Sequence, residues 1–123
     1  MLSKKNGKGK LYSIDISSNV GSLIPEELKG YWQLKILNKV NKKHLEKLLT
    51  EIGPIDIFIH DSDHTYYWQK LEYELALKYI SEGGYIMSDD ADASYAFLDF
   101  CNNHKLNPVF LYDLRKIFGI AKI

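Results

Sequence analysis

The composition is that of an ordinary globular protein without net charge. The 123 residues are 46% hydrophobic and 26% charged, and 16 basic residues balance 16 acidic ones. A chain of this length buries roughly two-thirds of the surface that its unfolded form exposes, so we expect one domain over residues 1–123. The zero balance excludes a whole-molecule field that would attract nucleic acid or an anionic membrane. Only the start of the chain is locally basic, at Lys4, Lys5, Lys8 and Lys10.

Cys101 is the only cysteine, and it cannot form a disulfide within the chain. No apolar run approaches the roughly 18 to 20 residues of a membrane span, and no signal-peptide core is recognisable. We therefore expect a cytoplasmic, reducing setting in which Cys101 is a packed thiol rather than a nucleophile.

Strands and helices are expected to alternate along the chain. The strands are predicted at residues 11–16, 31–37, 55–59, 85–88, 108–112 and 116–123. The helices are predicted at residues 25–29, 41–52, 67–80 and 93–104. We expect Asn41 to cap the second helix and Gly83-Gly84 to end the third. This alternation indicates an α/β fold with a mostly parallel sheet. The last two strands are joined by only three residues, so they must form an antiparallel hairpin.

The stretch from Pro54 to Tyr66 carries the strongest functional signal. Its first half, Ile55–Ile59, is short and rich in β-branched residues, which favours a buried parallel strand. Two acids and two histidines follow, at His60, Asp61, Asp63 and His64. In open α/β sheets ligands bind at the carboxyl ends of the strands, so these side chains are candidates for a site.

Acidic residues end three of the predicted strands: Asp15, then Asp61 with Asp63, and then Asp89 with Asp90. Carboxylates that converge repel one another, and a divalent cation removes that repulsion. Oxygen ligands favour Mg²⁺, or alternatively Ca²⁺ or Mn²⁺, over softer metals. Histidine titrates near neutral pH, and His64 follows Asp61 by three residues, so His64 is a candidate general base.

Each of these residues also has a structural interpretation. Acids are favoured at helix N-termini, so Asp63 is predicted to cap the helix that follows it, and Asp92 the next helix. His60 alternates away from His64 and is expected to be buried and hydrogen-bonded. The remaining histidines, His44 and His104, lie on polar helix faces and are expected at the surface. The aromatic group at 66–68 is typical of core or of a lid.

Two segments together resemble a known family. The run Ile55-Asp56-Ile57-Phe58-Ile59-His60-Asp61-Ser62-Asp63-His64-Thr65-Tyr66 is followed, after a helix, by Gly83-Gly84-Tyr85-Ile86-Met87-Ser88-Asp89-Asp90. This order resembles the second half of class I S-adenosylmethionine-dependent methyltransferases. It is most similar to the metal-dependent O-methyltransferases of the catechol and macrolide-sugar types.

The resemblance implies a role for each acid and for one histidine. Asp61, Asp89 and Asp90 would hold Mg²⁺, and His64 would take the proton of a small-molecule hydroxyl. Asp15 and Asp61 would be cofactor-binding residues, because the family acid that grips the ribose hydroxyls of S-adenosylmethionine falls on Asp15. The resemblance also implies a Rossmann-like sheet that ends in an antiparallel hairpin.

The resemblance begins at about Lys4 and lacks the family's first strand and glycine-rich cofactor loop. Gly7 and Gly9 do not replace that loop, because they precede the strand of Asp15 rather than follow a strand. Near the adenine the family often has an acid, where this chain has Asn38-Lys39. The missing strand is central in the family, so we expect the two strands beside it to pair directly or to form a homodimer edge.

Two other functions remain open at this point. The chain could be a non-catalytic methyltransferase remnant that acts as a dimerisation or partner-binding module. It could also be a metal phosphoesterase, a function suggested by Asp61-Ser62-Asp63-His64 alone, in which Asp63 would matter as much as Asp61.

Overall fold

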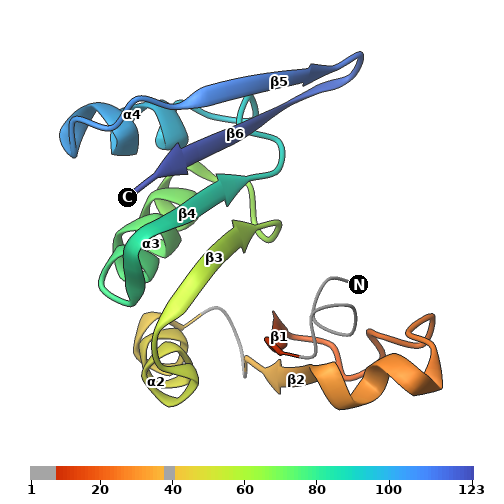
Figure 1. Ribbon diagram of the computed structural model, residues 1–123. Coiled ribbons are helices and arrows are strands. Elements are labelled where there is room, and N and C mark those ends of the chain that lie inside the picture. Colours follow the sequence, from red (N-terminus) through yellow and green to blue (C-terminus); the bar gives the residue numbers. More distant parts are fainter. Residues whose placement is uncertain (1–7, 38–40) are drawn as a thin grey trace. The chain divides into compact units, whose positions relative to one another are not determined.

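The computed structural model describes residues 8–37 and 41–123 (Figure 1). The chain forms two compact units, an N-terminal unit at Met1–Leu48 and a C-terminal unit at Leu49–Ile123. The expectation of one domain stays a prediction. Some residues used above lie outside the described ranges: Lys4, Lys5, Gly7, Asn38 and Lys39.

The N-terminal unit contains a two-stranded parallel sheet. Strand β1 (Leu11–Asp15) pairs with strand β2 (Trp32–Ile36), and the two run in register from start to end. Between them lies a short 3-10 helix, η1 (Glu26–Tyr31), which Pro25 precedes and which has Glu26 and Glu27 in its first turn. Proline and acidic residues are favoured at the start of a helix, because the first helical N–H groups have no intrahelical partner.

Helix α2 spans Lys42–Ile52, and both its start and its buried face agree with the sequence pattern. The Asn41 side-chain oxygen accepts hydrogen bonds from the backbone N–H groups of Lys43 (2.9 Å) and His44 (3.2 Å), so Asn41 is the N-cap. The leucines of the apolar stripe, spaced to share one helix face, are all buried: Leu45, Leu48 and Leu49.

The C-terminal unit is a four-stranded sheet with two helices. Its strands are β3 (Ile55–His60), β4 (Ile80–Ser88), β5 (Val109–Asp113) and β6 (Lys116–Lys122), in the spatial order β3-β4-β6-β5. Its helices are α3 (Tyr66–Leu77) and α4 (Ala96–Asn103). Strands β3 and β4 are parallel, whereas β6 runs antiparallel to both β4 and β5. The α/β architecture and the closing hairpin are therefore confirmed.

The core of this unit lies between the two helices and the sheet. It is built from α3, α4, β4 and β6, through Tyr73, Ala76, Ile86, Ala96, Phe97, Phe100, Cys101 and Ala121. The thiol of Cys101 is fully buried, and this burial raises its pKa to about 11, so it is a packed thiol as expected. No described helix is both long enough and apolar enough to cross a membrane.

The glycine pair at Gly83 and Gly84 does not end a helix, and that prediction is wrong. Helix α3 stops at Leu77, and β4 already begins at Ile80, which pairs with Ile55. The two glycines lie inside β4, where the pairing with β3 shifts register. A side chain on Gly84 would approach a backbone oxygen of β3 to 2.8 Å, so the close approach of the two strands requires glycine there.

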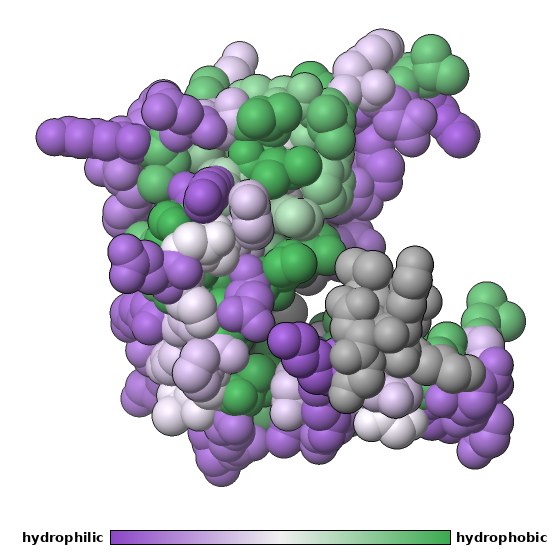
Figure 2. Space-filling model, viewed as in Figure 1, coloured by the Kyte–Doolittle hydropathy of each residue, from purple (hydrophilic) through white to green (hydrophobic). Residues whose placement is uncertain are grey.

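Strand β3 is buried on one face only, and within its sheet it is an edge strand. Ile57 and Ile59 are 52% and 55% exposed, whereas His60 is buried. Strands β1 and β3 belong to different units, and the expected direct pairing of these two strands stays a prediction. Figure 2 shows hydrophobic residues gathered over the strands of the C-terminal unit. Strand β5 has exposed apolar side chains along its length: Val109, Phe110, Leu111 and Tyr112.

Candidate active site

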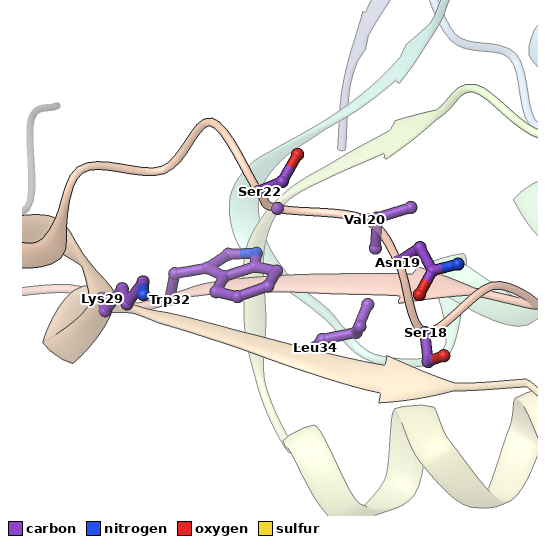
Figure 3. Close-up of a pocket in the computed structure, with 8 residues that line it drawn as sticks. Ser18, Asn19, Val20, Ser22, Lys29, Trp32 and Leu34 are labelled. Atoms are coloured by element: carbon purple, nitrogen blue, oxygen red, sulfur yellow. The ribbon is translucent and has the colours of Figure 1, made fainter.

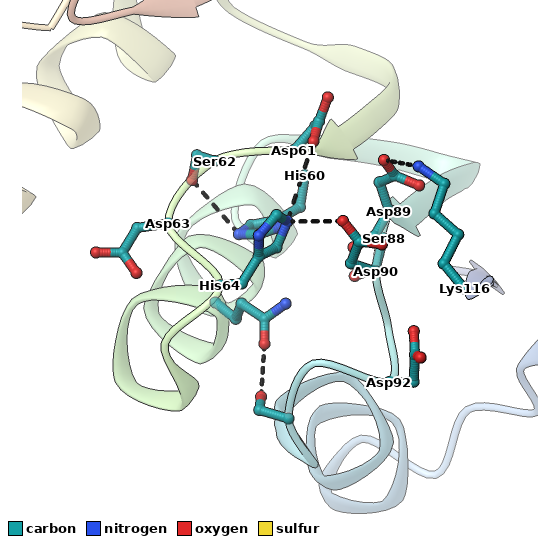
Figure 4. Close-up of polar contacts among 12 residues, drawn as sticks. His60, Asp61, Ser62, Asp63, His64, Ser88, Asp89, Asp90, Asp92 and Lys116 are labelled. Atoms are coloured by element: carbon teal, nitrogen blue, oxygen red, sulfur yellow. Dashed lines mark hydrogen bonds and ion pairs between the residues drawn. The ribbon is translucent and has the colours of Figure 1, made fainter.

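The candidate site lies at the carboxyl ends of β3 and β4, which are adjacent and parallel. His60 and Ser88, the last residues of the two strands, are register partners. Beyond them the backbone N–H of Asp89 donates to the carbonyl of His60 over 2.9 Å. The loops that begin at Asp61 and at Asp89 therefore start side by side, as the chain order predicted (Figure 4).

Three polar side chains meet at this point: Asp61, His64 and Asp90. Each offers one ligand atom, and these three atoms lie within 4.8 Å of one another. The Nε2 atom of His64 is 3.5 Å from Oδ2 of Asp90 and 4.0 Å from Oδ1 of Asp61. In Figure 4 dashed lines join the ring of His64 to both carboxylates. The structure thus brings together three of the residues singled out in the sequence.

The backbone at Asp90 turns sharply. Its φ is 48°, in the left-handed region, which few residues other than glycine, asparagine and aspartate adopt without strain. Its carbonyl accepts a hydrogen bond from the N–H of Ala93 over 2.9 Å, which closes the turn. This turn separates β4 from α4 and places the Asp90 carboxylate beside His64.

The donor set fits a divalent cation. The Nε2 atom of His64 is buried and makes no hydrogen bond with any described residue, although two carboxylates flank it. Asp61 and Asp90 supply the hard oxygens that Mg²⁺ prefers, and Mg²⁺ typically keeps water in its other positions. A single imidazole beside two carboxylates suits either a third ligand or a base next to the ion.

Asp89 is engaged differently, and its role as a metal ligand stays a prediction. Its Oδ2 accepts a hydrogen bond from Nζ of Lys116 over 2.6 Å, and this bond is the main cause of the raised pKa of Lys116. Lys116 was not recognised in the sequence. The antiparallel register of β6 with β4 pairs Gly119 with Ser88. This pairing brings Lys116, the first residue of β6, close to the acids that follow β4.

The two acids predicted as helix caps stand outside the cluster of Asp61, His64 and Asp90. The Oδ1 atom of Asp63 accepts a hydrogen bond from the N–H of Thr65 (2.9 Å), in a turn before α3. Thr65 is the N-cap residue of that helix, so the prediction that Asp63 caps it is wrong. Asp92 accepts from the N–H of Ile117 (2.9 Å), so its predicted cap role is wrong. The helix that Asp92 was expected to cap begins at Ala96.

Two buried polar residues, His60 and Glu72, lie behind the site and contact the exposed Ser62. Ser62 donates its hydroxyl hydrogen to Oε1 of Glu72 over 3.0 Å, and Nε2 of His60 is 3.5 Å from Oε2 of the same carboxyl. Burial raises the pKa of Glu72 to about 7 and lowers the pKa of His60. The expectation that His60 is buried is confirmed, whereas Glu72 was not singled out in the sequence.

Asp15 ends β1 in the N-terminal unit, as predicted. Its Oδ1 accepts a hydrogen bond from the N–H of Ser17 over 2.8 Å, and its carbonyl accepts from the N–H of Leu37 over 2.8 Å. The loop after Asp15 borders an open pocket of about 640 Å³ (Figure 3). The pocket is lined by Ser18, Asn19, Val20, Gly21, Ser22, Lys29, Trp32 and Leu34.

Comparisons with known proteins agree with this architecture. A family model described as a methyltransferase domain matches residues 1–91. A search of curated proteins gave no match. Among solved structures, the methyltransferase MycE of the mycinamycin pathway, in complex with Mg, SAH and mycinamycin VI, has a TM-score of 0.69 at 16% identity. That match covers 98% of this chain and 38% of MycE.

Two further structures share the fold. The fibrillarin pre-rRNA processing protein of Methanococcus jannaschii has a TM-score of 0.65 at 12% identity, over 94% of this chain and 56% of that one. A Streptococcus mutans protein assigned as a methyltransferase, in complex with SAH, has a TM-score of 0.63 at 15% identity, over 93% and 76%. The fold is therefore the Rossmann-like methyltransferase fold, and this chain spans 38% and 56% of the first two proteins. Since the family match runs from residue 1 through the strand ends that carry Asp61 and Asp90, the chain belongs to the methyltransferase domain family.

Proposed function

We propose that the chain carries the metal and base residues of an S-adenosylmethionine-dependent O-methyltransferase that acts on a small-molecule hydroxyl. The observation that carries this proposal is the meeting of Asp61, His64 and Asp90 at the ends of β3 and β4. The similarity to MycE, solved with Mg and SAH, supports it. In the transfer the hydroxyl oxygen forms a bond to the methyl carbon while the carbon–sulfur bond of the cofactor breaks.

Asp61 and Asp90 would hold Mg²⁺, and Asp89 would join them when it leaves Lys116. When bound, the ion orients the acceptor hydroxyl and lowers its pKa. His64 accepts the hydroxyl proton at Nε2, the atom that faces the two carboxylates and has no hydrogen-bond partner in the described parts of the chain. Neutral His64 must then carry its own proton on Nδ1.

Asp15 is proposed to bind the ribose hydroxyls of S-adenosylmethionine, with Asp61 as a second cofactor contact. One oxygen of the Asp15 carboxylate is already used by the N–H of Ser17, which fixes the orientation of the side chain. A carboxylate held in this way can accept a hydrogen bond from a ribose hydroxyl on its other oxygen.

Calorimetric titration with Mg²⁺ tests the metal assignment. Asp61→Asn and Asp90→Asn should each weaken binding by about tenfold or more, because each removes a charged ligand. Asp63→Asn is the matched control, since asparagine keeps the acceptor for Thr65 and leaves the cluster untouched. The proposal is wrong if the unmodified chain does not bind Mg²⁺. If Asp63→Asn weakened binding as much as Asp61→Asn, the phosphoesterase interpretation would be favoured instead.

The same titration with SAH tests the cofactor assignment. Asp15→Asn should weaken binding of SAH while it keeps the turn with Ser17, because asparagine still accepts that hydrogen bond but lacks the negative charge. Unchanged affinity in this variant would remove Asp15 from the proposed site.

A further inference from the structure

The loop of residues 61–64 carries two of the three site residues and is hydrogen-bonded to Glu72 of helix α3. Asp61 and His64 stand at the two ends of this loop, and Ser62 lies between them. The Ser62 hydroxyl donates to Oε1 of Glu72 over 3.0 Å, which ties the loop to the body of α3. Glu72 is only 7% exposed, whereas Ser62 is exposed, so the hydrogen bond joins a surface loop to a buried carboxyl.

Glu72 also faces the ring behind His64. Its Oε2 is 3.5 Å from Nε2 of His60, and the Ser62 hydroxyl is 3.4 Å from the same nitrogen. The rings of His60 and His64 meet edge to face, with centroids 5.7 Å apart. A second edge contact, with Tyr73 at 5.4 Å, supports the ring of His60 from the core. Glu72 therefore touches both the loop and the ring that packs against His64.

We propose that Glu72 is a positioning residue that acts through Ser62 and His60 to hold Asp61 and His64 in place beside Asp90. This inference rests on the proposed function, in which those three residues form the metal and base site. Groups that orient metal ligands from behind typically change metal affinity by about ten- to a hundredfold when they are removed.

A purely structural role for Glu72 makes a different prediction. A buried carboxyl is expensive for the folded state, and an apolar side chain of similar volume often fills such a position with no loss of stability. Removal of the carboxyl should then leave the melting temperature unchanged or raise it. If Glu72 positions the loop, metal affinity falls in the same variant, so stability and affinity change in opposite directions.

The experiment measures Mg²⁺ affinity and melting temperature in four variants of the full chain. Glu72→Leu and Ser62→Ala remove the same hydrogen bond from its two sides, so each should weaken Mg²⁺ binding by about tenfold, and the double variant no more than either alone. Glu72→Gln still accepts the Ser62 hydroxyl and should keep the Mg²⁺ affinity of the unmodified chain. Glu74→Leu is the matched control, because Glu74 also lies on α3 and contacts a histidine, His104 at 2.9 Å, away from the loop.

Wild-type affinity in both Glu72→Leu and Ser62→Ala would overturn the inference. If the unmodified chain binds no Mg²⁺, the proposed metal site fails, and the positioning role is then judged by NMR of the imidazole signals of His64. Those signals should shift in Glu72→Leu and Ser62→Ala and stay unchanged in Glu74→Leu. Unshifted signals in the first two variants would overturn the positioning role independently of the metal.

Discussion

At the scale of single residues, Glu72 links the stability of the fold to pH. Burial raises the pKa of its carboxyl from 4.5 to about 7, so the folded chain binds more protons than the unfolded chain between these two pH values. The free energy of unfolding therefore falls as the pH rises through this window. Above it, the carboxylate destabilises the folded state by up to about 3 kcal/mol.

Replacement of the Glu72 carboxyl should therefore raise the free energy of unfolding more at high pH than at low pH. The gain for Glu72→Leu should be about 2 kcal/mol larger at about pH 8 than at about pH 5, measured by urea denaturation. Glu72→Gln also lacks the charge and should show the same trend. A gain of equal size at both pH values would show that the carboxyl is not destabilised by burial.

The sequence predicted which acids follow β3 and β4, but it did not predict that Lys116 contacts one of them. Asp61, His64 and Asp90 follow predicted strands directly, so the parallel pairing of two strands is enough to bring them together. Lys116 is distant from Asp89 in the chain and reaches it only because β6 pairs with β4. The sequence predicted the hairpin but not its register, and a shift in that register changes which side chain meets Asp89.

At the scale of elements, helix α4 packs closely on strand β6. A side chain on Gly119 would collide with the ring of Phe97, which is 1% exposed and belongs to the core. Tightly packed interiors resist added atoms, because neighbouring side chains must leave their preferred rotamers. The absence of a side chain at Gly119 therefore fixes how closely the helix approaches the sheet.

We expect Gly119→Ala to lower the free energy of unfolding by about 1 to 3 kcal/mol, measured by urea denaturation. The Phe97 ring must shift to admit the new methyl group, and little space is available around a buried ring. Gly30→Ala serves as the control, because a side chain there would meet nothing within 4 Å. Equal stability of the two variants would mean that the contact with Phe97 relaxes freely.

Element boundaries that depend on tertiary contacts were the ones that the sequence missed. The cap of α2 at Asn41 is local and was predicted correctly. The Gly83-Gly84 pair is typical of a helix end, yet it lies in a strand, because the pairing of Ile80 with Ile55 extends β4 backward. Asp92 is a residue type that often caps helices, but its carboxylate accepts a hydrogen bond from the N–H of Ile117. The helix begins only at Ala96.

At the scale of the whole molecule, β3 is a sheet edge with apolar residues on its exposed face. Its only strand partner in the described parts of the chain is β4, and Ile57 and Ile59 are each more than half exposed. Open strand edges of this kind readily pair with another chain. We propose that a second copy of this chain pairs with β3, which is the homodimer expected from the sequence.

Light scattering over a range of concentrations should then show a dimer that dissociates on dilution. Ile59→Lys should abolish it, because a charge on an edge strand opposes pairing. Leu98→Lys, on the exposed side of α4, should leave it intact. A chain that stays monomeric at all concentrations contradicts the proposal, whereas a dimer that binds neither Mg²⁺ nor SAH would favour the non-catalytic module.

The left-handed backbone at Asp90 limits how this site can change by mutation. In a library with all residues at position 90, only glycine, asparagine and aspartate fit the turn easily, and only aspartate brings a negative charge. Position 61 has no such limit, because its φ is not positive. Selection for a different metal at the proposed site should therefore change Asp61 and leave Asp90 in place.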